Sequence, residues 1–271
     1  MVARVRGPGV APARCVPSAA RHVCRTAAAR APRARPRHRP PHPPARRRAH
    51  TRTPTMHTIT EQALIGQLNW RYATKKFDPA RKIPEATFQA LMQAARLAPS
   101  SYGLQPYAVV IVTDGALRQA LRPHSWNQSQ VTDASHFMVF AVRTELDQAW
   151  VDHTMRVMAS ARGVERASLA PWEGMVSGFV KGFTSEAAKH EWSAKQLYMA
   201  GGVLLTAAAL LGVDACPLEG IDPAKYDQVL GLEARRLHAL FAVALGYRAA
   251  DDKHARAAKA RLPEGDMFVR L

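Results

Sequence analysis

Hydrophobic positions recur at helical spacing in two early stretches of the chain. The spacing of Thr58 and Glu61 is that of a capping box and predicts a helix that runs to about Trp70. Pro84 followed by an acidic residue predicts the start of a second helix, and Pro99 predicts its end. The apolar face of this second helix has the spacing i, i+3, i+4, i+7 and consists of Phe88, Leu91, Met92 and Ala95.

Three short runs of apolar, β-branched and aromatic residues predict buried strands. They cover residues 107–112, 137–142 and 237–245. Uninterrupted apolar runs of this length are typical of strands that are covered on both faces. Residues 116–121 predict a helix between the first two strands. Helices therefore alternate with strands, which indicates a layered α/β or α+β domain.

Residues 197–213 form an almost wholly apolar segment of 17 residues. A helix needs about 20 such residues to cross a bilayer, so we expect a buried helix and no membrane contact. Gly201, Gly202 and the alanines at 207–209 give this helix small surfaces where another element can approach closely. A place in the core and a place at a subunit interface are both open for it.

Composition changes sharply near residue 56. Residues 1–55 hold 14 of the 38 basic residues, all of them arginine, together with ten of the 19 prolines and no Asp or Glu. The remainder has 24 basic and 21 acidic residues, so most of the net charge of +17 comes from this stretch. Such a stretch has too little apolar surface to fold. We therefore expect a disordered extension, 1–55, and one folded domain, 56–271.

Three explanations of the extension are open. A targeting presequence is Arg-rich and acid-poor but also Ser-rich and amphipathic, and Ser18 is the only serine here. A nucleic-acid-binding tail fits the charge, yet residues 1–55 contain no aromatic side chain to stack on a base. A start codon assigned too far upstream, with Met56 as the true first residue, fits the abrupt onset of pattern. The near-neutral remainder argues against a nucleic-acid partner.

Cysteine usage limits the kinds of site that the chain can carry. Residues 56–271 contain one cysteine, Cys216, so we expect no disulfide framework and no Cys-based metal site, and the cytosol is the natural compartment. The chain also lacks the Gly-x-Gly-x-x-Gly and Walker A patterns. The usual dinucleotide and nucleoside triphosphate loops are therefore not expected.

Three cations are candidates for binding a phosphate group. Arg71 directly follows the first predicted helix, while Lys259 and Arg261 are two residues apart and face the same way in an extended arm. Arginine is well suited to a phosphate dianion because its planar fork donates two parallel hydrogen bonds. Ordinary solvated surface cations are the alternative, since most Lys and Arg side chains are exposed.

Two polar loops are candidates for binding the rest of a ligand. Loop 99–106 carries hydroxyl, amide and backbone donors up to the start of a buried strand, and a helix stop with turn serines is the alternative. Asn127 and Gln130 can hydrogen-bond the edge of a heterocycle, with an exposed polar turn as the alternative. His136 is expected to be a structural histidine rather than a catalytic one.

A fourth motif, Pro-Leu-Glu-Gly at 217–220, is expected to form a glycine turn where backbone can approach a ring. The motifs together suit a phosphorylated flavin and resemble the nitroreductase family, in its oxygen-insensitive NAD(P)H:FMN branch. The segments that carry the resemblance are 71–75 with Phe77, 99–106, 126–127, 133–136, 217–220 and 259–263.

The resemblance spans nearly all of residues 57–271 and implies both a fold and a site. The fold is an α+β three-layer sandwich, with a mostly antiparallel central sheet flanked by helices, in an intimate homodimer with one FMN in each of two clefts. The cofactor-binding residues that it implies are Arg71, Tyr72, Ala73, Lys75, Pro99, Ser100, Ser101, Gly103, Gln105, Asn127, Gln130, Pro217, Leu218, Glu219, Gly220, Lys259 and Arg261.

The roles that the resemblance implies are divided among these residues. Arg71, Lys259 and Arg261 contact the phosphate, and Lys75 and Asn127 contact the flavin edge. The backbone amides at 219–220 lie near flavin N5. Pro99, Ser100 and Ser101 reach the flavin from the other subunit.

Four positions depart from the well-known members. Tyr72, Ala73, Gly103 and Gln130 stand where His, Ser, Asn and Lys are common. Gln130 matters most, because a lysine there would stabilise negative charge near flavin N1 and O2, and an amide offers only a dipole. Lys75 is then left to carry that role alone.

The resemblance implies an FMN-dependent oxidoreductase that works by a ping-pong route. NAD(P)H gives hydride to flavin N5 and leaves, and an electron-poor acceptor such as a nitroaromatic or a quinone takes its place. The cofactor performs the redox chemistry, so no side chain is assigned as general acid or base, and no metal is expected. Alternatives on the same scaffold are a dehalogenase and an enal or aldehyde reductase. A basic-tailed nucleic-acid-binding protein and a flavin-binding protein without turnover are alternatives of other classes.

Acceptor choice is expected to depend on residues 172–183. Three glycines recur there every four residues and weaken a helix by about 1 kcal/mol each relative to alanine, which predicts a mobile aromatic flap. In the related enzymes this region lies over the flavin, so Phe179 and Phe183 are expected to line the substrate channel. The alternative is that these two rings, at i and i+4, pack one helical face into the core.

Overall fold

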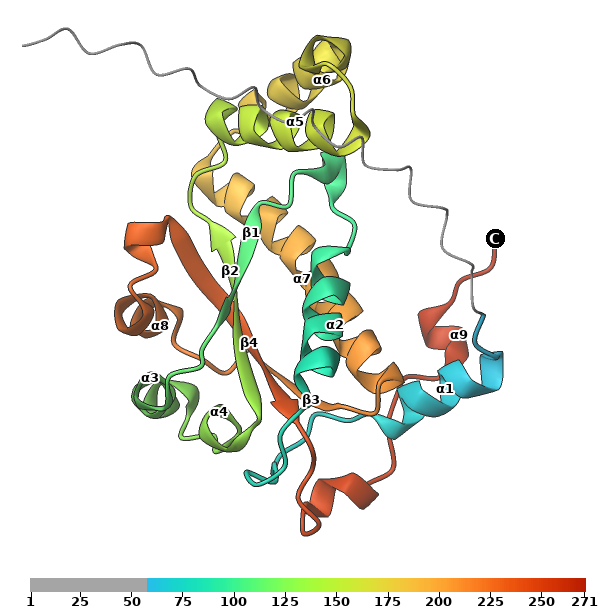
Figure 1. Ribbon diagram of the computed structural model, residues 1–271. Helices are drawn as coiled ribbons and strands as arrows, with labels where there is room; N and C mark the ends of the chain where they lie inside the picture. The colour runs from blue at the N-terminus through green and yellow to red at the C-terminus, as the bar shows by residue number, and fades with distance from the viewer. Residues whose placement is uncertain (1–57) are drawn as a thin grey trace, which may run out of the picture. The chain divides into compact units, whose positions relative to one another are not determined.

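An antiparallel sheet of four strands lies at the centre of residues 58–271, which are the residues that this computed structural model describes (Figure 1). The order across the sheet is β1-β2-β4-β3, and every neighbouring pair is antiparallel. The expectations for residues 1–55 lie outside the described residues. The strands are β1 (Tyr107–Ile111), β2 (His136–Arg143), β3 (Asp214–Leu218) and β4 (Leu237–Gly246).

The three strands predicted from apolar runs are confirmed, and β3 is an addition. The longest pairing joins β2 and β4 from His136 opposite Leu245 to Arg143 opposite Leu237, with a bulge between Phe140 and Ala141. Both strands are buried along almost their whole length. Burial on both faces explains why these runs are apolar without alternation.

Helices cover the two faces of the sheet and make three layers. In Figure 1, α2 and α7 lie on one side, and α3, α4 and α8 lie on the other. The α+β sandwich that the resemblance implied is therefore confirmed. The helices are α1 (Glu61–Trp70), α2 (Glu85–Arg96), α3 (Gly115–Leu121), α4 (Gln130–Asp133), α5 (Gln148–Arg162), α6 (Ala170–Lys181), α7 (Glu186–Leu210), α8 (Pro223–Leu230) and α9 (Glu264–Met267).

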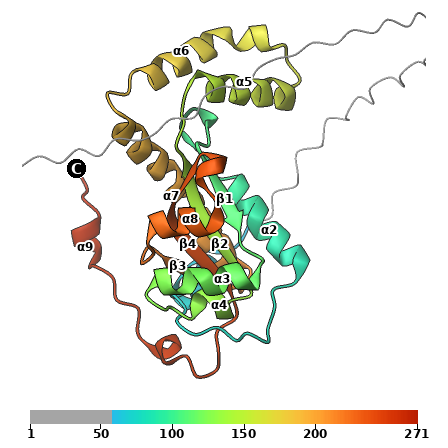
Figure 2. The same cartoon turned by 90° about the vertical axis from the view of Figure 1, so that its left-hand side faces the viewer.

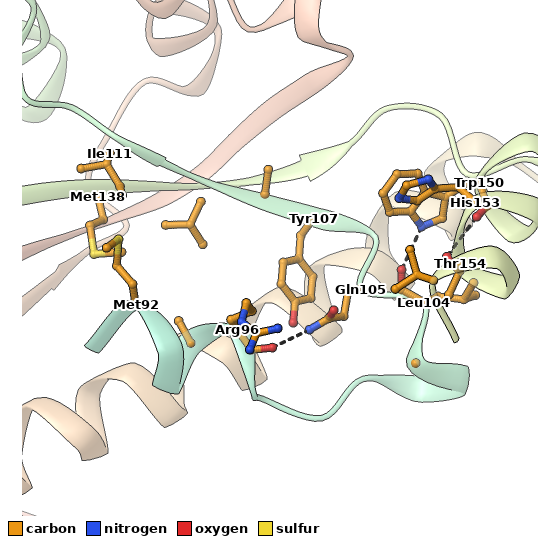
Figure 3. A pocket seen from close by; sticks show the side chains of 15 residues that line it. Met92, Arg96, Leu104, Gln105, Tyr107, Ile111, Met138, Trp150, His153 and Thr154 are labelled. Carbon is orange, nitrogen blue, oxygen red and sulfur yellow. Dashed lines mark hydrogen bonds between the residues drawn. The ribbon is translucent and has the colours of Figure 1, made fainter. Parts of the chain in front are cut away.

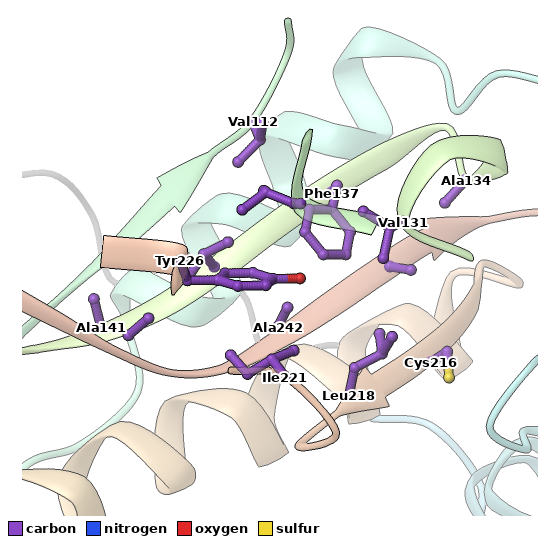
Figure 4. Packing of buried hydrophobic residues seen from close by; sticks show 14 of the residues in the cluster. Val112, Val131, Ala134, Phe137, Ala141, Cys216, Leu218, Ile221, Tyr226 and Ala242 are labelled. Carbon is purple, nitrogen blue, oxygen red and sulfur yellow. The ribbon is translucent and has the colours of Figure 1, made fainter. Parts of the chain in front are cut away.

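A hydrophobic cluster fills each side of the sheet. Figure 4 shows Tyr226 and Phe137 in the middle of the cluster beneath α3, α4 and α8. Burial raises the pKa of the Tyr226 phenol to about 12, and its hydroxyl lies 2.6 Å from Ser125 Oγ. The one polar atom of this buried ring therefore has a partner, as a buried hydroxyl requires.

The start of α1 differs from the capping box expected at Thr58. Thr60 is the cap, and its Oγ1 accepts a hydrogen bond of 3.2 Å from the N–H of Ala63. Two threonines stand two residues apart in front of Glu61, and the one with extended backbone next to the first helical residue makes the cap. The prediction for α2 is confirmed, since this helix begins at Glu85 and ends at Arg96, before Pro99.

The predicted apolar helix at 197–213 is the second half of α7, which begins eleven residues earlier, at Glu186, and ends at Leu210. Gly201 faces the sheet, where a Cβ atom would stand 2.8 Å from Cζ of Phe241, whereas a Cβ on Gly202 would meet nothing within 4 Å. The place in the core, one of the two left open for this helix, is thus confirmed, and a place at a subunit interface stays a prediction. Within residues 58–271, no helix is long and apolar enough to cross a membrane.

Helices α5 and α6 form a smaller layer beyond one end of the sheet (Figure 2). Residues 172–183, expected as a mobile flap, fall mostly within the regular helix α6. The glycines at 174 and 178 face open space and leave the helix intact. A third hydrophobic cluster joins the two helices to Leu104 and to the start of α7.

Candidate functional site

The three phosphate candidates line one hollow of about 370 Å³. Arg71 follows the last residue of α1, and Lys259 and Arg261 belong to the arm that follows β4. The described lining of this hollow contains no Asp or Glu; it consists of 69–73, 254–255 and 257–261. Cations from two distant parts of the sequence therefore share a site without a carboxylate to neutralise them.

Repulsion among the three cations contributes to lowering the pKa values of Arg71 and Lys259. Burial lowers the pKa of Arg71, and the charge of Arg261 lowers it further. Burial, then the charges of Arg71 and Arg261, lower the pKa of Lys259. Lys259 Nζ donates hydrogen bonds to the carbonyls of Leu68 and Arg71, whereas Nε of Arg71 has no partner within residues 58–271. An anion bound in the hollow would offset the repulsion between the cations and would accept a hydrogen bond from Nε of Arg71.

The segment after Arg71 lies along strand β3. Ala73 forms a parallel bridge with Ala215, and the N–H of Thr74 donates to the carbonyl of Ala215 at 3.3 Å. The backbone N–H groups of Lys75 and Lys76 are held by Asp252. The segment 71–75 is thereby fixed beside β3, the strand that leads into the Pro-Leu-Glu-Gly motif at 217–220.

Lys75 and Gln130 approach β3 at Cys216. Burial raises the pKa of the Cys216 thiol, while the nearby charges of Lys75 and Arg71 act to lower it. Gln130 is buried, and its Nε2 lies 4.0 Å from Cys216 Sγ. Its amide thus points toward the strand, and Lys75 is the cation at this position.

Strand β3 ends in the Pro-Leu-Glu-Gly motif at 217–220, which contacts the loop that carries Asn127. Pro217 and Leu218, expected in a turn, are the last two residues of this strand. Gln128 Nε2 donates to the carbonyl of Gly220 at 3.3 Å, and the ring of Trp126 lies so close that a Cβ on Gly220 would stand 2.4 Å from it. A larger residue at position 220 would displace the exposed Trp126 ring from this place.

Asn127 is exposed in the same loop and has a left-handed backbone with φ of 55°. Trp126 before it has φ of 53°. Such angles in two successive residues other than glycine are uncommon, and they cluster at functional sites. The loop is held against the β3 end by a hydrogen bond of 2.8 Å from the N–H of Asp222 to the carbonyl of His124.

The remaining loop, 99–105, lies on the opposite side of α7 from Glu219. The N–H of Ser101 donates to Gln196 at 2.8 Å, and the hydroxyl of Tyr198 donates to Glu219 at 2.7 Å. Two residues apart on a helix means about 200° around its axis. Within residues 58–271 of one protomer, the structure therefore does not bring Ser101 and Glu219 together.

Loop 99–105 also borders a second hollow, of about 380 Å³, between α2, β1 and α5. Gly103 and Gln105 line it, and Gln105 Nε2 donates to the carbonyl of Arg96 at 2.9 Å (Figure 3). Ser100 Oγ accepts from the N–H of Gln105 at 3.0 Å, so the hydroxyl of Ser100 shapes its own turn.

Phe179 and Phe183 pack in the cluster around α5 and α6. Their ring centroids lie 5.0 Å apart, and Phe179 also lies 4.8 Å from Tyr102 and 5.2 Å from Trp192. This is the packing that the core alternative expected within one chain, and a contact with an acceptor stays a prediction. His136 stacks on Phe88 at 3.7 Å, as expected of a structural histidine.

Two residues at the site were not found from the sequence. Asp252 follows another aspartate after a strand, which is the ordinary pattern of a solvated turn, and its buried contacts gave no local signal. Tyr198 lies within the apolar stretch of α7, where its hydroxyl was hidden among core positions. No cluster of three or more His, Cys, Asp or Glu side chains suited to a metal ion occurs among residues 58–271.

Comparison with known proteins gives consistent relatives. The model of the family described as "Nitroreductase family" matches residues 68–247. The Staphylococcus epidermidis protein named "Putative NAD(P)H nitroreductase SERP2086" is 34% identical over 215 residues, which cover 76% of this chain and 96% of that protein. A protein of the same description from Staphylococcus haemolyticus is 32% identical over 218 residues, 77% of this chain and 97% of its own length.

Solved structures share the fold at low identity. An Exiguobacterium sibiricum protein solved in complex with FMN has a TM-score of 0.66 and 20% identity, covering 80% of this chain and 100% of its own. An enone reductase named CLA-ER, from gut-bacterial fatty acid saturation metabolism, has a TM-score of 0.62 and 21% identity, covering 78% and 96%. The extent of the family match and the identity to the staphylococcal proteins are decisive: this chain belongs to the nitroreductase family.

Proposed function

We propose that the chain is an FMN-dependent NAD(P)H oxidoreductase that reduces electron-poor acceptors. The observation that carries this proposal is the hollow of Arg71, Lys259 and Arg261, which has three cations and no carboxylate in its described lining. The names of the staphylococcal relatives and the FMN in the Exiguobacterium structure support it.

The residues present fit a flavin phosphate. The buried Nε of Arg71 is free to donate, and a phosphate dianion would offset the repulsion that lowers the pKa values of Arg71 and Lys259. Lys259 is anchored to the carbonyls at the end of α1, so its charge is held in place. Arg261 is exposed on the same arm and completes the set.

The other motifs supply contacts for the ring system. We assign the flavin edge to Lys75 and Asn127, with Lys75 as its cation because Gln130 is turned toward Cys216. The backbone at Glu219 and Gly220 is proposed to face the flavin ring, and the exposed Trp126 ring, which lies over Gly220, must then move aside. When bound, FMN supplies hydride acceptance from NAD(P)H and hydride donation to the acceptor.

Donor and acceptor are proposed to use one binding position in turn, which is a ping-pong order. The protein's share is orientation and electrostatics, so we assign no general acid or base. Nitroaromatics and quinones are the acceptors proposed first. An activated alkene is the second candidate, which the enone reductase among the structural neighbours favours. A buried free thiol at Cys216 fits a reducing, cytosolic compartment.

Arg261→Ala is expected to weaken FMN binding by about 1.5–3 kcal/mol, the usual scale for a hydrogen bond to a charged group. Riboflavin binding should hardly change, because riboflavin lacks the phosphate. Titration of the apoprotein with both flavins measures this. Arg256→Ala is the matched control, since this exposed arginine on the same arm does not line the hollow. Equal losses for the two flavins would show that Arg261 does not contact the phosphate.

Phe179→Ala or Phe183→Ala is expected to change the ranking of quinone and nitroaromatic acceptors by kcat/KM. Flavin content and the NAD(P)H half-reaction should stay nearly intact, because the rings are proposed to line the acceptor channel without contacting FMN. Stopped-flow of both half-reactions separates these effects. Loss of folding or flavin in both variants, with an unchanged ranking, would assign the two rings to packing alone.

A homodimer is proposed because loop 99–105 and Glu219 lie on opposite sides of α7 in one protomer. Exposed apolar side chains on α1, α7 and the carboxyl-terminal arm support it; they include Ile65, Met199, Leu262 and Phe268. If Ser100 and Ser101 serve the partner's flavin, flavin loss and dissociation should be coupled. Sedimentation of holo and apo protein tests this, and a monomer that keeps stoichiometric FMN would contradict it.

A further inference from the structure

Asp252 is a buried carboxylate at the start of the carboxyl-terminal arm. Its side chain is 1% exposed. Its Oδ2 accepts hydrogen bonds from the hydroxyl of Tyr72 at 2.8 Å and from the N–H groups of Lys75 at 2.9 Å and Lys76 at 3.0 Å. Its Oδ1 accepts from the N–H of His254 at 3.0 Å. One side chain thus binds two segments that are about 180 residues apart in sequence.

These two segments are the two halves of the cation hollow. Tyr72 lines the hollow next to Arg71, and His254 lines it on the arm that carries Lys259 and Arg261. Asp252 itself does not line the hollow. Its position is therefore behind the site, where its hydrogen bonds connect the two walls.

The charge of Asp252 is held by N–H and O–H donors and not by the site cations. Burial acts to raise its pKa, but the hydrogen bonds from Tyr72 and from the backbone at 75, 76 and 254 outweigh burial and lower the pKa to about 2. The Nδ1 atom of the exposed His254 lies 3.4 Å from Asp252 Oδ1. Asp252 therefore does not neutralise the three cations of the hollow by direct contact.

We propose that Asp252 is a positioning residue for the phosphate site, which sets the spacing between Arg71 and the pair on the arm. This inference rests on the proposed function. Without the carboxylate, the loop and the arm separate and the cations no longer converge on one phosphate. The ring contacts at Gly220 and Asn127 lie on other loops and are kept. Lys75, whose N–H Asp252 also binds, would shift for FMN and riboflavin alike, since both carry the same ring.

The test compares Asp252→Asn with Asp251→Asn as the matched control. Asp251 is the neighbouring residue, is exposed, and pairs with the Lys76 ammonium only at the surface. Each variant removes one negative charge from the same turn. Titrating each apoprotein with FMN and with riboflavin gives the preference for the phosphorylated flavin, a ratio that a general loss of stability does not change.

Asp252→Asn is expected to reduce the preference for FMN over riboflavin by about 10-fold or more, since an amide cannot replace all the charge-assisted hydrogen bonds. Asp251→Asn should keep the wild-type preference. Tyr72→Phe removes one of the four hydrogen bonds and leaves the carboxylate in place. It should reduce the preference by a smaller factor, and it serves as the test if Asp252→Asn does not fold.

The outcomes of this test distinguish a failure of the positioning role from a failure of the proposed function. A wild-type protein that binds FMN and riboflavin equally well would overturn the phosphate site and this inference with it. A wild-type preference that survives both Asp252→Asn and Tyr72→Phe would overturn only the positioning role. Equal weakening of both flavins, together with a lower Tm, would show that Asp252 supports the fold alone.

Discussion

Replacing Phe241 with alanine is expected to lower the free energy of unfolding by about 3–5 kcal/mol, the cost of removing a buried aromatic side chain and leaving a cavity. Phe241 is 3% exposed on β4. Its ring stacks on Phe140 with centroids 4.6 Å apart and on Tyr198 with centroids 4.7 Å apart. It thus joins the two central strands to α7, and its removal leaves a cavity between them.

A substitution at Gly201 tests the packing around Phe241 more specifically. A Cβ there would stand 2.8 Å from the Phe241 ring, so Gly201→Ala should destabilise by about 1–3 kcal/mol through overpacking, although alanine favours the helix by about 1 kcal/mol. In the Phe241→Ala background the ring is gone, and the same change should be neutral or stabilising. The two substitutions are therefore expected to be strongly non-additive.

Urea unfolding of the wild type, both single variants and the double variant measures this coupling. Phe241→Leu is the graded control, since it keeps most of the volume and should cost less than the alanine variant. Additive effects would mean that Gly201 and Phe241 do not press against each other, and the close packing of α7 on the sheet would be wrong.

The same packing explains which elements could be predicted from the sequence. Strands β2 and β4 are buried on both faces, so their apolar runs identify them without any other knowledge. The second half of α7 is predictable for the same reason. Its first half was missed because Glu186, Lys189 and His190 lie at the helix start, beyond the main core, and the polar composition there hides the helix.

Strand β3 was missed because local sequence and tertiary position disagree. Pro217 lacks an N–H and argues against a central strand, but β3 is the edge strand of the four-stranded sheet, and its outer side carries only the isolated bridge from Ala73 to Ala215 within residues 58–271. Its residues pair with β4 from Asp214 opposite Gly246 to Leu218 opposite Ala242. Only the sheet order, which no local pattern encodes, makes the proline acceptable.

The residues of the candidate site could likewise be predicted only in part. Arg71, Lys259 and Arg261 could be grouped from their residue types and their motifs, and the structure places them around one hollow. Asp252 could not be found, because its role depends on contacts with Tyr72 and Lys75 that are distant in sequence. Site residues that lie in local motifs can thus be recognised from the sequence, whereas the buried groups that hold them in place cannot.

A second large effect on stability is expected at the ion pair of Asp214 and Arg248. Asp214 is 4% exposed and accepts hydrogen bonds of 2.8 Å from both the N–H and the Nε of Arg248. The Arg248 guanidinium lies over the rings of Trp70 and Tyr72, 4.3 and 4.6 Å from their centroids. Asp214→Ala leaves this partly buried cation without its carboxylate, so we expect a loss of about 3 kcal/mol in the free energy of unfolding.

Thermal and urea unfolding of Asp214→Ala measure this loss, with Asp251→Ala as the control for an exposed aspartate in an ion pair, for which no measurable change is expected. A second variant isolates the cause. If the cost comes from an unpaired buried charge, Asp214→Ala combined with Arg248→Leu should recover much of the stability, because an apolar pair can replace a buried ion pair at little cost. A double variant that is less stable than Asp214→Ala would instead show that Arg248 contributes mainly through its packing on Trp70 and Tyr72, and that its charge tolerates the loss of its partner.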